Sequence, residues 1–180
     1  QDGEKPRSTG FIDFFRYLFP AVIMSDREIR DDTDVERRVN HALLKGLRSD
    51  VEIYRCRRTI AATPRYAAYL AMANGLRRRQ ARFLLEGTYR DTLGFAVHNA
   101  SVDARAYVAG GRTAVCLTQS HLETASTVVA VPQGRLAESD GLGSYAVVDL
   151  GGGRAEVRLD RHAFALLVFV QEASSCATTH

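Results

Sequence analysis

The residues whose types could do chemistry are carboxylates and arginines that follow two short strand-like runs, at residues 21–24 and 50–56. They are Asp26, Arg27 and Glu28 after the first run, and Glu52 and Arg55 within the second. Where strands alternate with helices, side chains at the carboxyl ends of the strands gather on one face. Two carboxylates beside a guanidinium suit glycoside hydrolysis, in which one acid protonates the leaving oxygen and the other acts as nucleophile or base. We take Asp26, Arg27, Glu52 and Arg55 as candidate substrate-binding residues and leave the catalytic residues unassigned.

The same carboxylates also fit a purely structural interpretation. Asp26 and Glu28 suit a solvated loop, and Glu52 suits a strand residue that is paired with an arginine. No specific motif surrounds either position, and charged residues also form purely structural ion pairs. The sequence leaves both interpretations open.

Other chemistries find little support in the sequence. The five histidines stand far apart, and none has a second ligand at the short spacing that metal sites use. Gly151–Gly153 precede Arg154 and a strand, without the lysine and hydroxyl residue of a phosphate loop. No serine nucleophile elbow is present, and no cysteine has a recognisable catalytic context. We therefore expect no metal and no cofactor.

Charge, hydrophobicity and cysteine usage limit which binding partners and which cellular compartment fit the sequence. Residues 1–90 carry 18 basic against 12 acidic side chains, whereas residues 91–180 carry 6 against 9. The arginines at 77–82 suit a helix end, so we expect no nucleic-acid partner. No run approaches 18 apolar residues, so we expect no membrane span. Three unpaired cysteines and a polar first segment without a signal peptide favour a cytoplasmic protein, and the missing initiator Met predicts that the chain begins inside a longer one.

The first half predicts alternating strands and helices. Phe11, Phe14, Phe15 and Leu18 give one helical face, and Thr33 with Glu36 forms a capping box that would begin a second helix. Thr63 and Pro64 open a third helix. The runs 21–24 and 50–56 repeat at about 29 residues, the length of one βα unit. Such a short segment cannot close a (β/α)₈ barrel, which needs roughly 250 residues.

In the second half of the chain the residue pattern is that of β-strands. Runs of strand-forming residues recur every 8–12 positions, which is the spacing of an antiparallel sandwich. They lie at 95–100, 104–109, 112–118, 127–131, 144–150, 155–159 and 163–170. The apolar run Phe83–Leu85 predicts a further strand at the start of this half. We expect an α/β domain at 1–82, followed by an all-β domain at 83–180.

Four segments carry a family resemblance: FFRYLFPAVIMSDREIRDD, ALLKGLRSDVEIYRCR, TPRYAAYLAMANGLRRR and FLLEGTYRDTLGF. Their order resembles the last strands and helices of a (β/α)₈ glycoside hydrolase barrel running into its C-terminal β-sandwich, in poorly characterised glycosidase-like proteins. The resemblance implies a carbohydrate substrate and places Asp26, Glu52 and Arg55 at the rim of the substrate pocket. In such families the catalytic carboxylates usually sit on middle strands, which would precede Gln1.

Two functions follow from these observations. In the first, the chain is the C-terminal fragment of a glycoside hydrolase, inactive alone, that either oligomerises or lacks an N-terminal barrel region. In the second, it is a non-catalytic module that binds carbohydrate or protein. Sugar-binding sandwiches usually present exposed aromatic side chains. Trp is absent, and the second half holds only Tyr107 and Tyr145 as tyrosines, which weakens the second function.

Overall fold

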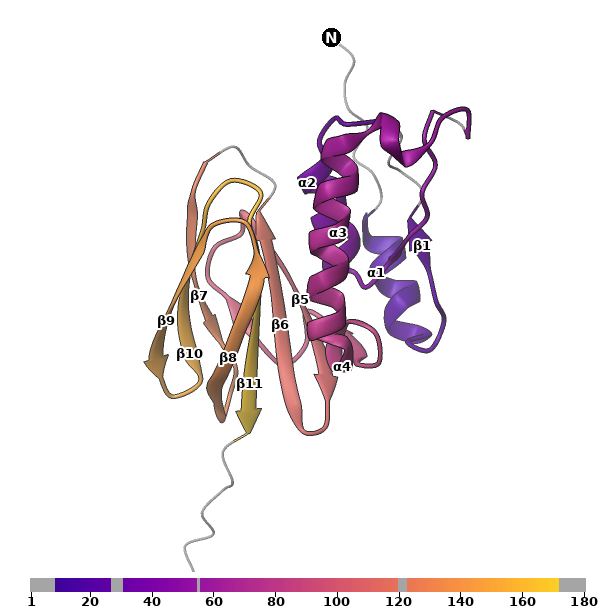
Figure 1. Ribbon diagram of the computed structural model, residues 1–180. Helices are drawn as coiled ribbons and strands as arrows, with labels where there is room; N and C mark the ends of the chain where they lie inside the picture. Colours follow the sequence, from indigo (N-terminus) through magenta and orange to yellow (C-terminus); the bar gives the residue numbers. More distant parts are fainter. Residues whose placement is uncertain (1–8, 27–30, 55, 120–122, 172–180) are drawn as a thin grey trace, which may run out of the picture.

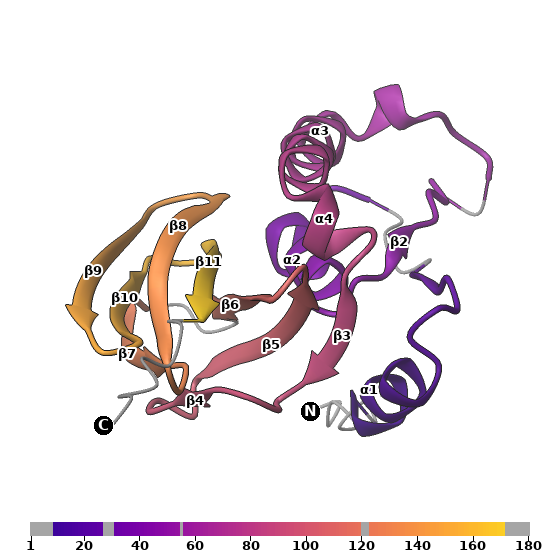
Figure 2. The ribbon, with the colours of Figure 1, turned by 90° about the horizontal axis from the view of Figure 1, so that it is seen from below.

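The computed structural model describes residues 9–26, 31–54, 56–119 and 123–171, with side chains from residue 14 onward. The described chain forms three layers, in which helices cover one face of a five-stranded sheet and a four-stranded sheet covers the other (Figures 1 and 2). More of the described residues lie in strands than in helices. The helices all precede the strands of the two larger sheets.

The helical layer contains a small parallel strand pair. Its elements are α1 (Thr9–Leu18), β1 (Ser25–Asp26), α2 (Val35–Leu44), β2 (Arg48–Ser49), the 3-10 helix η1 (Ile60–Ala62), α3 (Pro64–Arg79) and α4 (Ala81–Leu84). β1 and β2 run parallel, with Ser25 opposite Arg48 and Asp26 opposite Ser49. The sequence predicts the order strand, helix, strand, helix, but neither strand lies in its predicted run: β1 begins directly after residues 21–24, and β2 ends before residues 50–56. The pair is two strands wide.

The β-rich part is a sandwich of two antiparallel sheets, as the sequence predicts. Its strands are β3 (Thr88–Asp91), β4 (Ala96–Val97), β5 (Val102–Ala109), β6 (Arg112–Gln119), β7 (Ala125–Ala130), β8 (Gly134–Leu142), β9 (Tyr145–Gly151), β10 (Arg154–Leu159) and β11 (Phe164–Gln171). The five-stranded sheet has the order β3-β5-β6-β11-β8, and the four-stranded sheet has the order β4-β7-β10-β9.

The five-stranded sheet is buried on both faces. On β11, Phe164, Leu166 and Val168 join the core under the helices, while the alternate residues Leu167 and Phe169 join the core between the sheets. A strand covered on both faces has no solvent side, so its sequence is a continuous apolar run instead of an alternating one. The helical layer and the sandwich therefore share one central sheet.

Three local predictions were wrong. The run 50–56 is not a strand, because Tyr54 and Cys56 have positive φ of 47° and 60°, which no strand adopts. Thr33 and Glu36 form no capping box, since Asp34 precedes α2 in a left-handed conformation without a capping hydrogen bond. The run Phe83–Leu85 is not a strand, because Phe83 and Leu84 belong to α4. Both side chains are buried in the core between the helices and the five-stranded sheet. The first sandwich strand is β3.

The sequence does not predict β8 as a strand, and the ion pairs of β8 explain why. β8 is mostly polar and lies at the edge of the five-stranded sheet beside β11. Asp140 accepts two hydrogen bonds of 2.9 Å from Arg79 of α3, and Glu138 pairs with Arg82 of α4. These bonds and burial act on the carboxyl of Asp140 in opposite directions, and the net effect is a lowered pKa. The charged face of β8 is thus covered by arginines from the helices.

Candidate functional site

The carboxyl ends of β1 and β2 lie side by side. The N–H of Arg48 donates to the carbonyl of Met24 at 2.7 Å, and the N–H of Asp50 donates to the carbonyl of Asp26 at 3.0 Å. These two bonds bracket the strand pair. Asp26 therefore ends β1 next to Ser49 and Asp50, at the edge where parallel strands present side chains for chemistry.

Arg77 of α3 connects the helix to β2. Its side chain is 7% exposed, and it donates to the carbonyl of Leu47 and, at 3.4 Å, to the hydroxyl of Ser49. Burial, together with the charge of Arg48, lowers the pKa of Arg77. Ser49 consequently faces α3.

Asp26 lies on the same face of the strand pair as Ser49, the face toward α3. Residues opposite each other in a ladder lie on the same face, so Asp26 is on the α3 side with Ser49. Burial raises the pKa of the Tyr66 phenol on α3, and the charges of Asp26 and Asp50 raise it further. Ser25 and Arg48 occupy the opposite face of the pair.

The structure describes two of the four predicted site residues. Asp26 is half-buried at the end of β1, and Glu52 is half-buried in the connection between β2 and η1. Arg27 and Arg55 lie outside the described residues. The assignment of these four side chains to a substrate pocket stays a prediction.

Tyr54 is an aromatic side chain in the same segment as Glu52, within the predicted strand at residues 50–56. It is 41% exposed, and the guanidinium of Arg58 lies 4.8 Å from the centroid of its ring. An exposed aromatic ring beside a guanidinium suits the apolar face and the hydroxyls of a sugar. Its backbone is left-handed, with a φ of 47°, which no sequence pattern signals.

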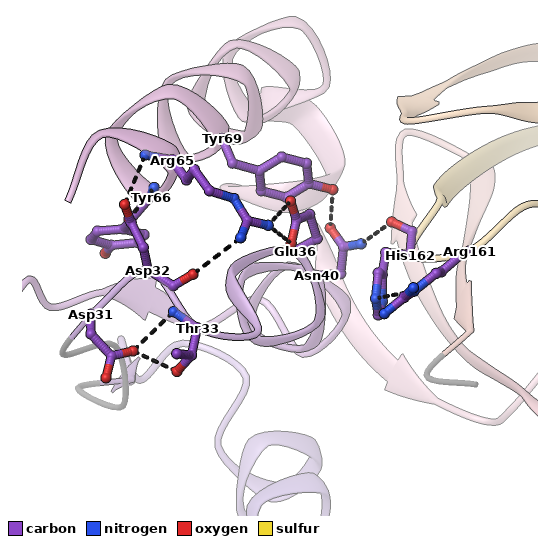
Figure 3. A network of polar contacts seen from close by, with 10 residues as sticks. All are labelled: Asp31, Asp32, Thr33, Glu36, Asn40, Arg65, Tyr66, Tyr69, Arg161 and His162. Carbon is purple, nitrogen blue, oxygen red and sulfur yellow. Dashed lines mark hydrogen bonds and ion pairs between the residues drawn. The ribbon is translucent and has the colours of Figure 1, made fainter. Parts of the chain in front are cut away.

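A polar network joins α2, α3 and the segment before β11 (Figure 3). The Tyr69 hydroxyl donates to Asn40 at 2.9 Å, and the Asn40 amide donates to the His162 carbonyl at 2.7 Å. Burial raises the pKa of Tyr69 to about 12. Arg65 on α3 pairs with Glu36 on α2 at 3.1 Å. Because these groups satisfy one another, the network fixes the helices to the sandwich and is not itself a site for chemistry.

Within the described ranges, no cluster of three His, Cys, Asp or Glu side chains could hold a metal ion. None of the described helices is both long and apolar enough to span a membrane. The expectations of no metal site and no membrane partner remain predictions for the whole chain.

The part of the chain before β1 carries several large apolar side chains that are exposed. We call these side chains the N-terminal apolar surface, and they come from α1 and the segment before β1: Phe14, Leu18, Phe19, Val22 and Ile23. Phe14 is 60% exposed and Ile23 is 75% exposed. Where such side chains are contiguous, they mark an interaction surface on a folded protein.

Comparisons with known proteins bear on the fold. No protein-family model matches the sequence, and no curated protein matches it. A GH30 endoxylanase from Clostridium papyrosolvens C71 has a similar structure, with a TM-score of 0.51 and 12% identity, over 87% of this chain and 45% of that one. An Anoxybacillus α-amylase gives a TM-score of 0.56 and 13% identity, over 90% of this chain and 41% of that one. The chain has the fold of part of these glycoside hydrolases. It spans less than half the length of either.

Proposed function

We propose that this chain is the C-terminal portion of a carbohydrate-active glycoside hydrolase. In this proposal residues 1–82 complete a (β/α)₈-type barrel, and residues 83–180 form the sandwich that supports it. The observation that carries the proposal is the parallel pair β1 and β2, each strand followed by a helix, beside the N-terminal apolar surface.

A parallel pair of this size is not a complete structural unit. Parallel strands occur almost only in sheets that are covered on both faces, and two strands alone are marginally stable. Among the residues that the structure describes, β1 and β2 pair only with each other, so each has one open edge there. Further βα units would pair with these edges and cover the N-terminal apolar surface. The partial coverage of two glycoside hydrolase structures supports this source for the missing units.

The substrate of the complete protein would be a carbohydrate, as the names of the similar xylanase and amylase suggest. Asp26, Arg27, Glu52 and Arg55 would lie at the rim of the pocket, and the acid and nucleophile would come from the missing strands. Tyr54 would add an aromatic surface at the same rim.

The first test is activity. We expect the purified chain to show no turnover of aryl glycosides, because it lacks the strands that would carry the catalytic carboxylates. Co-expression with the segment encoded directly before it should restore turnover. Activity of the chain alone that Asp26→Asn or Glu52→Gln abolishes would contradict the proposal, as would an upstream frame that encodes no βα units.

The second test is association. Open strand edges and exposed apolar residues promote self-association, so light scattering should show a mass that rises with protein concentration. The double variant Phe14→Lys and Ile23→Lys should lower that mass toward the monomer. Val148→Lys is the matched control, because Val148 is 55% exposed on β9, in the sandwich. A monomer at all concentrations would count against the missing barrel units.

A further inference from the structure

A shallow groove lies at the open edge of β5, in the sandwich. Its volume is about 260 Å³, and the lining residues that matter here come from the β3–β4 connection, β4 and β5: Thr92, Phe95, Val97, Val102, Asp103 and Arg105. Pockets for drug-sized ligands measure roughly 300–1,000 Å³, so this groove suits a ligand of about one ring.

Strand pairing explains why the groove is open. β3 pairs with β5 only from Ala106 onward, and β4 pairs with β7 instead of β5. Residues 102–105 of β5 therefore have β6 on one side and no strand on the other. The chain from Thr92 to Ala100 passes along this open side.

One part of the lining is apolar. Val102 and Ala104 belong to the buried core between the sheets, and Phe95 and Val97 are partly buried against the same core. Phe95 thus offers an aromatic ring that is held in place by packing. Such a ring suits the apolar face of a sugar.

The rest of the lining is polar and holds one acidic and one basic side chain, Asp103 and Arg105. Arg105 pairs with Asp91 at 2.9 Å, so its positive charge is compensated. Asp103 is exposed and forms no ion pair with any residue that the structure describes. The side-chain oxygen of Asn99 already accepts from Ser101, and its amide donates to the Ser126 carbonyl. Asp103 is consequently the charged acceptor available to a ligand.

We propose that this groove binds one pyranose ring of a neutral carbohydrate. The ring would lie against Phe95 and donate hydroxyl hydrogen bonds to the carboxylate of Asp103. The carboxylate of Asp103 disfavours anions, because the positive charge of Arg105 is already paired with Asp91. An added peptide strand is disfavoured too, because Arg105 already donates to the Ala104 carbonyl at 2.7 Å, on this short edge. The proposal concerns the sandwich alone and does not rest on the barrel.

The test is a titration of the isotope-labelled chain with xylotriose and maltotriose, followed by amide chemical shifts. Shallow single-ring sites bind weakly, so we expect saturation with a dissociation constant on the order of 1 mM for at least one sugar. The shifts should centre on residues 92–105. Asp103→Ala should weaken binding about tenfold through loss of a charged acceptor, and Phe95→Leu should weaken it through loss of the ring.

Glu156→Ala is the matched control, because Glu156 is an exposed carboxylate on β10. It should leave binding unchanged. Absence of saturable shifts, shifts centred elsewhere, equal binding by the Asp103 variant, or stronger shifts with lysine than with either sugar would each overturn the proposal. If the chain binds a sugar at this groove but has no glycosidase activity, this proposal is supported, whatever the tests of the missing barrel units show.

Discussion

Replacing Phe164 with alanine is expected to lower the free energy of unfolding by about 3–5 kcal/mol, the cost of removing a fully buried phenylalanine. Phe164 is 0% exposed on β11 and belongs to the core under the helices. Because β11 also carries the core between the sheets, the helical layer and the sandwich should unfold in one transition. Thermal unfolding followed by circular dichroism measures the loss of stability, and the amide NMR signals of residues 1–82 and 83–180 show whether both parts unfold together.

Val148→Ala is the control for this prediction. Val148 is 55% exposed on β9, so its truncation should change stability by no more than about 0.5 kcal/mol. Two separate transitions, with helical signal lost before the sandwich unfolds, would show that residues 1–82 and 83–180 are independent domains. They would also show that the shared central sheet does not couple them.

The sandwich could be predicted from sequence because its main signals are local. Each of the seven strand-like runs overlaps a strand of the structure, since alternation and turn residues act within a few positions of the chain. β8 was missed because its acidic residues are compensated by Arg79 and Arg82, more than 50 positions earlier. A pattern within β8 cannot reveal partners at that separation.

The candidate site was harder to predict, for a related reason. Glu52 was placed on a strand, but the left-handed backbone at Tyr54 ends any strand there and is fixed by the surrounding fold. The side of the pair on which Asp26 lies follows from its register with Ser49 and from the contact between Ser49 and Arg77. Both facts join segments that are distant in sequence. The arrangement of the groove beside β5 likewise depends on where β3 stops pairing.

Two adjacent glycines in the β9–β10 turn give the most discriminating stability test. Gly152 and Gly153 both have positive φ, of 58° and 73°. A Cβ at Gly152 would meet nothing within 4 Å, whereas one at Gly153 would overlap the Val131 carbonyl oxygen and approach that of Gly134. Gly153 also accepts a hydrogen bond of 2.8 Å from the Val131 N–H, so its backbone cannot move without cost.

Gly152→Ala should therefore cost only the left-handed penalty of about 1–2 kcal/mol. Gly153→Ala should cost about 4 kcal/mol or more, because it adds a backbone clash to the same penalty and loosens β7 from the turn. Chemical denaturation of the two variants beside the parent chain measures the difference. Equal losses would mean that the conformation of the turn alone matters and that the close approach between Gly153 and Val131 is not a constraint of the native sandwich.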